Sequence, residues 1–154
     1  MRACAAMRRE TIRWLDCYLG VAFLIASMAR PALAGDVVYF IVPPWIQSGV
    51  TLDMVRRGQL TDTSKWLGLE LPCSQWEHVS SFDSAADCEE HRRTLLLVSS
   101  AGLEGTEDAI QRVAALVTKL SLKQVREMAP QLAVVFPAIW ESRCVASSDP
   151  RLSR

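Results

Sequence analysis

The residues best suited to chemistry are three cysteines and two histidines that follow residue 34: Cys73, Cys88, Cys144, His78 and His91. Cys88 and His91 are three positions apart in a segment with helical periodicity, so both could face one metal ion, and Cys73 with His78 could complete a ligand set. The chain has no Cys-x-x-Cys or His-x-x-x-His pair, which are the usual anchors of zinc sites. The sequence therefore predicts no metal site and no cofactor.

Nucleophilic catalysis would also have to use these side chains, because His78 and His91 are the only imidazole bases in the chain. No Gly-x-Ser-x-Gly turn is present. The acidic pairs at 89–90 and 107–108 fit a solvated helix face and a helix start better than a catalytic pair. We therefore predict a domain without enzymatic activity. The alternative is an extracytoplasmic enzyme that uses His78 or His91.

Four tryptophans follow residue 34 and could anchor a partner or stack on a sugar ring. Trp76 and Trp140 lie in segments with strand character, so we expect both in the core. Trp45 and Trp66 flank an irregular segment broken by glycine and proline. These two are the predicted surface-binding candidates.

The first 34 residues have the order of an export signal. Arginines come first, an uncharged run follows at 17–29, and Pro31 precedes the triplet Ala32-Leu33-Ala34. The run is shorter than the about 20 residues that a bilayer-spanning helix needs. We expect a signal peptide at 1–34 and a protein exported to the periplasm or beyond the cell. An uncleaved helix that tethers the domain to the membrane is the alternative.

Charge excludes one class of partner. The signal would remove five of the 17 basic residues and two of the 17 acidic ones, which leaves 12 and 15 and a net charge of −3. A mildly acidic domain has no electrostatic footprint for nucleic acid. We expect no nucleic-acid partner, and contact with a membrane only through the signal segment.

Export places the three remaining cysteines in an oxidising compartment, where a disulfide persists. Cys88 lies on the inward face of a predicted helix and Cys144 in a predicted strand, so a helix packed on a sheet can bring them together. Closing this loop of about 55 residues contributes on the order of 4 kcal/mol. We predict a Cys88–Cys144 bridge with Cys73 left over. A Cys73–Cys88 bridge and two separately buried thiols are the alternatives.

The elements that would position these residues indicate an α+β fold. Strands are expected at 37–42, at 75–82 with a bulge, and at 139–147. Helices are expected at 52–57, at 84–98 with an end at 99–102, after Thr106, and after Ser121 with an end or kink before Pro130. This predicts a small, mainly antiparallel sheet with two or three packed helices after a signal helix. The single domain spans 35–147, and 148–154 form a flexible tail.

Three blocks of the sequence resemble a class of small, uncharacterised exported bacterial proteins. The blocks are the strand ending in Pro43-Pro44, the stretch from Trp76 through Ser81-Phe82 to Cys88-Glu89, and the closing Arg143-Cys144 with Asp149-Pro150-Arg151-Leu152. The resemblance implies that Cys88 and Cys144 are the paired cysteines and that Cys73 is an extra one. It implies no activity. Together with the residues, it leads us to expect an exported structural or binding module.

Overall fold

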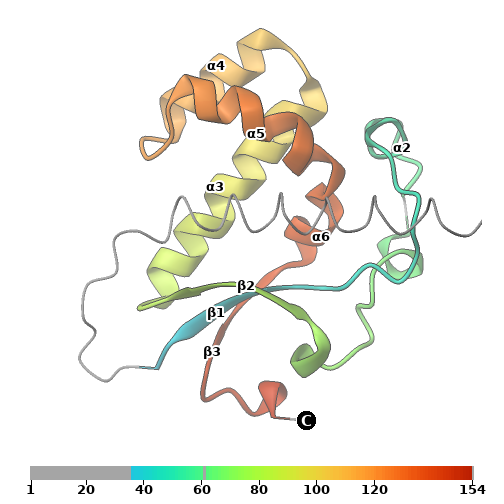
Figure 1. Ribbon diagram of the computed structural model, residues 1–154, viewed down its shortest axis with the longest axis vertical. Coiled ribbons are helices and arrows are strands. Elements are labelled where there is room, and N and C mark those ends of the chain that lie inside the picture. Colours follow the sequence, from blue (N-terminus) through green and yellow to red (C-terminus); the bar gives the residue numbers. More distant parts are fainter. Residues whose placement is uncertain (1–35, 61, 154) are drawn as a thin grey trace, which may run out of the picture. The chain divides into compact units, whose positions relative to one another are not determined.

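The computed structural model describes residues 36–60 and 62–153 and shows the α+β fold that the sequence predicts. A three-stranded antiparallel sheet has the order β2-β1-β3, formed by Val38–Val42 (β1), Glu77–Phe82 (β2) and Arg143–Ala146 (β3). Helices α3, α4, α5 and α6 lie on one side of this sheet, and the C-terminal turn lies on the other (Figure 1). The predicted signal peptide falls outside the described residues.

The central strand β1 forms because its residues are β-branched or aromatic, and Pro43 and Pro44 end it. Its partner β2 contains the expected bulge. Phe40 pairs with Ser80 whereas Ile41 pairs with His78, so Val79 is the additional residue. The bulge keeps apolar side chains on the helix side of β2 at both Val79 and Phe82.

Helix α3 (Ala85–Glu104) starts as predicted but runs past its predicted end at 99–102. The Ser84 side chain accepts a hydrogen bond from the Asp87 backbone N–H at the start. At the other end, the Ser99 hydroxyl donates to the Leu95 carbonyl inside the helix, and Gly102 is buried against another helix. Packing therefore outweighs the weak helix propensity of these residues. Gly105, at φ 70°, ends the helix.

The next two helices begin where their capping residues predict. Thr106 caps α4 (Glu107–Leu116), and Ser121 with Gln124 forms a capping box on α5 (Leu122–Val134). Of the two predicted effects of Pro130, an end or a kink, the end is wrong, because α5 continues to Val134. Ala129 and Ala133 are fully buried, so the packing of α5 compensates for the hydrogen bond that Pro130 cannot donate.

The predicted third strand is correct only in its second half. Residues 139–141 belong to α6 (Phe136–Glu141), and β3 starts at Arg143. Pro137 lies in the first turn of α6, where proline favours a helix start. Because of this helix, Trp140 is 59% exposed, which overturns its predicted place in the core. The short α2 (Leu52–Arg56) appears where it was expected.

The two faces of the sheet carry two separate apolar clusters. Val38, Phe40 and Val42 of β1 pack under the helices, while Ile41 and Tyr39 face the opposite side. Strand geometry requires this alternation. The opposite cluster consists of Ile41, Cys73, Trp76 and Val145, with Tyr39 and Leu152 packed against it. Leu152 belongs to the 3-10 turn Pro150–Leu152, so this part of the predicted flexible tail packs against the sheet.

Candidate functional site

The two histidines lie on opposite faces of the sheet. The ring of His78 contacts Tyr39, with centroids 4.6 Å apart, whereas that of His91 contacts Phe40 at 5.5 Å and Phe82 at 5.0 Å. Tyr39 and Phe40 are neighbours in β1, so their side chains point to opposite sides. The structure does not bring the two predicted imidazole bases into one cleft.

His91 is partly buried. Its ring extends from α3 and packs against the rings of Phe82 and Phe40. Burial, assisted by the Lys119 cation, lowers the pKa of His91 from 6.5 to about 4. The ring is therefore neutral at pH 7 and contributes to aromatic packing. His78 is exposed, and its Nε2 lies 3.0 Å from both the Ser80 carbonyl and the Ser81 hydroxyl.

The cysteines pair as predicted. Cys88 of α3 and Cys144 of β3 form a disulfide with a Cα–Cα distance of 6.0 Å, and Cys73 is free and buried. The alternative Cys73–Cys88 bridge is therefore wrong. Residues 36–60 and 62–153 contain no group of three or more side chains able to hold a metal ion.

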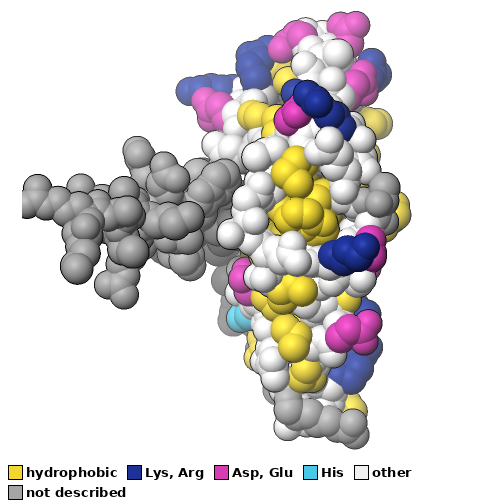
Figure 2. Space-filling view, turned by 90° about the vertical axis from the view of Figure 1, so that its right-hand side faces the viewer, with side chains coloured by type: hydrophobic (Ala, Val, Ile, Leu, Met, Phe, Trp, Pro, Cys, Tyr) yellow, Lys and Arg dark blue, Asp and Glu magenta, His cyan; other side chains and the backbone are white. Residues whose placement is uncertain are grey.

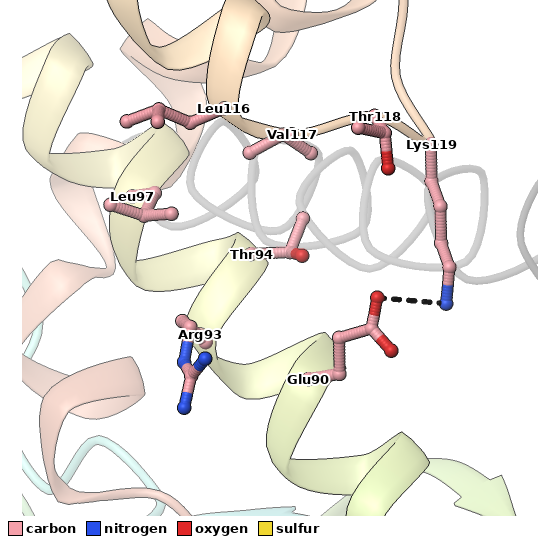
Figure 3. A pocket seen from close by; sticks show the side chains of 8 residues that line it. All are labelled: Glu90, Arg93, Thr94, Leu97, Leu116, Val117, Thr118 and Lys119. Carbon is pink, nitrogen blue, oxygen red and sulfur yellow. Dashed lines mark ion pairs between the residues drawn. The ribbon is translucent and has the colours of Figure 1, made fainter.

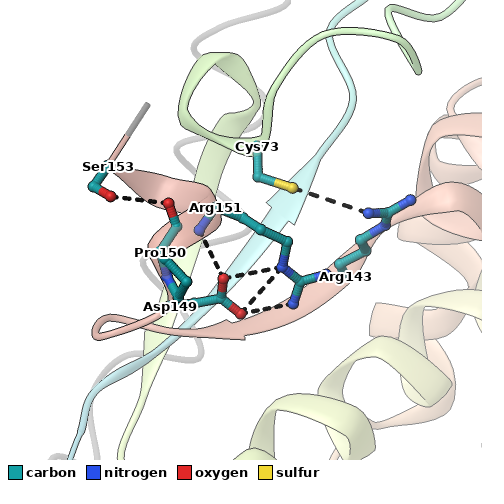
Figure 4. Close-up of polar contacts among 6 residues, drawn as sticks. All are labelled: Cys73, Arg143, Asp149, Pro150, Arg151 and Ser153. Carbon is teal, nitrogen blue, oxygen red and sulfur yellow. Dashed lines mark hydrogen bonds and ion pairs between the residues drawn. The ribbon is translucent and has the colours of Figure 1, made fainter.

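The free Cys73 belongs to a polar cluster on the outer face of the sheet (Figure 4). The Arg143 guanidinium lies 4.8 Å from the Trp76 ring and 4.0 Å from the Cys73 sulfur. Beside it, Asp149 accepts hydrogen bonds from the side chain and the backbone of Arg151, which lower the pKa of Asp149 to about 2. The Asp149–Arg151 contacts lie within the C-terminal turn, and the Arg143 contacts join β3 to the segment of Cys73 and Trp76. We assign both sets a structural role.

Trp45 and Trp66, which were predicted to lie at the surface, are partly buried, whereas Trp140 is exposed. Trp45 forms a backbone bridge with Leu67, and the Ile46 N–H donates to the Trp66 carbonyl at 2.9 Å. Trp140 is exposed beside Phe136, with ring centroids 5.9 Å apart. Figure 2 shows apolar side chains in a band along one face of the domain, with charged side chains beside them.

A groove that sequence reasoning missed lies between α3 and the segment that follows α4 (Figure 3). It holds about 230 Å³ of space, and eight residues line it: Glu90, Arg93, Thr94, Leu97, Leu116, Val117, Thr118 and Lys119. We call it the α3–α4 groove. The spacing of its α3 residues is the only signal in the sequence, since 90, 93, 94 and 97 share one helix face.

The charges in the α3–α4 groove are unevenly matched. Glu90 forms an ion pair of 3.1 Å with Lys119, so each cancels the other. Figure 3 shows the Arg93 guanidinium directed away from this pair. Within the described part of the chain, Arg93 has no ion pair or hydrogen bond from its side chain. The groove therefore combines one uncompensated cation with an apolar wall.

Comparison of the chain with protein-family models, curated proteins and solved structures found no match. The resemblance to small exported bacterial proteins stays a prediction. Among the helices of residues 36–60 and 62–153, none is both long and apolar enough to cross a membrane.

Proposed function

We propose that this protein is an exported, non-enzymatic binding module, and that its ligand site is the α3–α4 groove. The observation that carries the proposal is the lining of this groove, which combines Arg93, whose guanidinium has no partner among the described residues, with an apolar wall of Leu97, Leu116 and Val117. Small-ligand sites are mainly apolar hollows of roughly 300–1,000 Å³ that contain a few polar groups. The groove is smaller, at about 230 Å³, but it also places polar groups beside an apolar wall, which consists of Leu97, Leu116 and Val117.

Export is supported by the disulfide and by the order of residues 1–34. A bridge between Cys88 and Cys144 persists in an oxidising compartment and is rare in the cytosol. The non-enzymatic proposal is supported by the histidines, because His78 and His91 contact opposite faces of β1. An enzyme that uses one of them would need its other groups from that same face.

The intact mass of the protein from a bacterial envelope fraction tests export. We expect a mass that begins at Gly35. After denaturation we expect one alkylated thiol without reductant and three with it, because Cys73 is free and Cys88 is bridged to Cys144. A mass that retains residues 1–34 would refute cleavage of the signal. Three thiols alkylated without reductant would refute the disulfide bridge.

Amide chemical shifts of the 15N-labelled, oxidised protein test the binding function. The probes are hexanoate, hexylammonium and hexanol, which share an alkyl chain and differ in charge. At least one of them should shift the amides of Thr94, Val117 and Thr118 in a saturable manner. If none does so at millimolar concentration, the α3–α4 groove is not a ligand site and the proposed function is wrong.

A further inference from the structure

We infer that the α3–α4 groove selects a small aliphatic monocarboxylate, whose carboxylate pairs with Arg93 and whose alkyl chain lies on Leu97, Leu116 and Val117. This inference rests on the proposed function, since it names the ligand class of the same groove. Three features support it: the charge left over in the groove, its apolar wall and its hydroxyl groups.

The charge argument starts from the acids that could neutralise Arg93. On a helix, Glu89 and Glu90 lie four and three positions before it, within reach of its side chain. Glu89 instead pairs with Arg92 at 3.6 Å, and Glu90 pairs with Lys119 at 3.1 Å. Both nearby acids are thus engaged elsewhere. The groove keeps one net positive charge, which favours an anion over a cation.

The wall explains why the anion should carry an alkyl chain. Leu116, the last residue of α4, is 68% exposed, which is the largest value among the exposed large hydrophobic residues of the described chain. Leu97 lies near it on α3 (Figure 3). An alkyl chain laid across these side chains removes apolar surface from water, which stabilises the complex.

The hydroxyl groups add hydrogen-bond donors between the charged ends of the groove. Thr94 and Thr118 both line it, and neither hydroxyl has a partner among the described residues. A carboxylate has two oxygens that accept hydrogen bonds from such donors. The Glu90 carboxylate repels an anion at the Lys119 end, so the head group should lie toward Arg93 and Thr94.

The test compares hexanoate, hexylammonium and acetate at pH 7, with the amide shifts of the full, oxidised protein as the readout. Hexanoate should bind in the α3–α4 groove with a dissociation constant on the order of 1–10 mM. Acetate should bind more weakly because it lacks the chain. Hexylammonium should not shift the groove amides.

Two matched pairs of variants locate the binding energy. Arg93→Gln should weaken hexanoate binding about fivefold, whereas Arg57→Gln, which alters an exposed arginine of an α2 ion pair, should leave it unchanged. Leu116→Ser should reduce the ratio of the acetate dissociation constant to the hexanoate dissociation constant about threefold. Leu122→Ser, at the exposed start of α5, should leave this ratio unchanged.

The outcomes separate this inference from the proposed function. If hexylammonium or hexanol binds in the groove and hexanoate does not, the ligand class is wrong and the binding function stands. If hexanoate shifts the groove amides equally in wild type and Arg93→Gln, pairing with Arg93 is wrong. If no probe acts on the groove, both proposals fail.

Discussion

The close crossing of α3 and α5 depends on Gly102 and provides the sharpest test of the fold. A Cβ atom added at Gly102 would lie 1.9 Å from the Ala129 carbonyl oxygen and 2.9 Å from the Ala133 Cβ. The nearest atom is backbone, which cannot rotate away, so Gly102→Ala has to push the two helices apart. Overpacking of this kind costs about 3 kcal/mol, and the better helix propensity of alanine returns about 1 kcal/mol.

The net loss of about 2 kcal/mol should lower Tm by roughly 6–10 °C in a domain of this size. Thermal unfolding followed by far-UV circular dichroism measures it on the oxidised protein. Ser100→Ala is the matched control, because Ser100 is an exposed residue of the same helix and the change tests propensity without the crossing. A Gly102→Ala variant as stable as the wild type would refute the close approach of α3 and α5.

Three further predictions concern the disulfide, the buried imidazole and the tryptophans. Replacing both Cys88 and Cys144 by alanine should lower the free energy of unfolding in urea by about 4 kcal/mol, and a loss under 1 kcal/mol would show that the bridge constrains little. The folded protein keeps His91 neutral down to pH about 4, whereas the unfolded chain takes up that proton below 6.5, so stability is lost as the pH falls between these values. The free energy of unfolding should fall by at most about 1.4 kcal/mol per pH unit, and this contribution should be absent in His91→Leu. If urea unfolding gives the wild type and His91→Leu the same dependence of stability on pH, the burial of this ring is contradicted. Trp76→Ala should lower the free energy of unfolding by about 3–5 kcal/mol and Trp140→Ala by less than about 1 kcal/mol, because Trp76 is 6% exposed and Trp140 59%. The reverse order in urea unfolding would contradict the position of Trp140 on α6.

Helix starts could be predicted from the sequence because a cap is a local interaction. Ser84, Thr106 and Ser121 each accept a hydrogen bond from a backbone N–H three residues later, at the predicted helix starts. Helix ends depended on distant contacts. Gly102 and Pro130 both disfavour a helix interior, yet both lie within helices at the α3–α5 contact region.

The predicted third strand shows a related limit. The apolar run before Arg143 suits a strand or a buried helix equally well, and periodicity alone does not separate them. In the structure, Ile139 is buried within α6 while Trp140 points outward, as expected for neighbours on a helix packed against a core. The strand prediction for this run is the reason that Trp140 is expected in the core, although it is exposed. Trp45 and Trp66 lie in an irregular segment whose packing the sequence does not indicate.

The disulfide could be predicted because the expected secondary structure and the expected compartment limited the choices, whereas the α3–α4 groove could not. The groove arises where the segment after α4 passes beside α3, and only the tertiary fold determines which α3 residues it meets. The ion pair between Glu90 and Lys119 joins positions far apart in sequence. Without that contact, nothing in the sequence distinguishes Arg93 from the paired Arg92 next to it.

Stability and ligand binding should be separable in this domain because they depend on different faces of α3. The inner face carries Cys88, which ties the helix to β3, and the groove face carries Arg93 and Leu97. The opposite wall of the groove belongs to 116–119, and no strand contributes to it. Loss of the disulfide should therefore reduce the folded fraction while the folded molecules keep their affinity for hexanoate. Under conditions where the cysteine-free variant remains folded, an unchanged dissociation constant would support this separation, and a large loss of affinity would show that the bridge also shapes the groove.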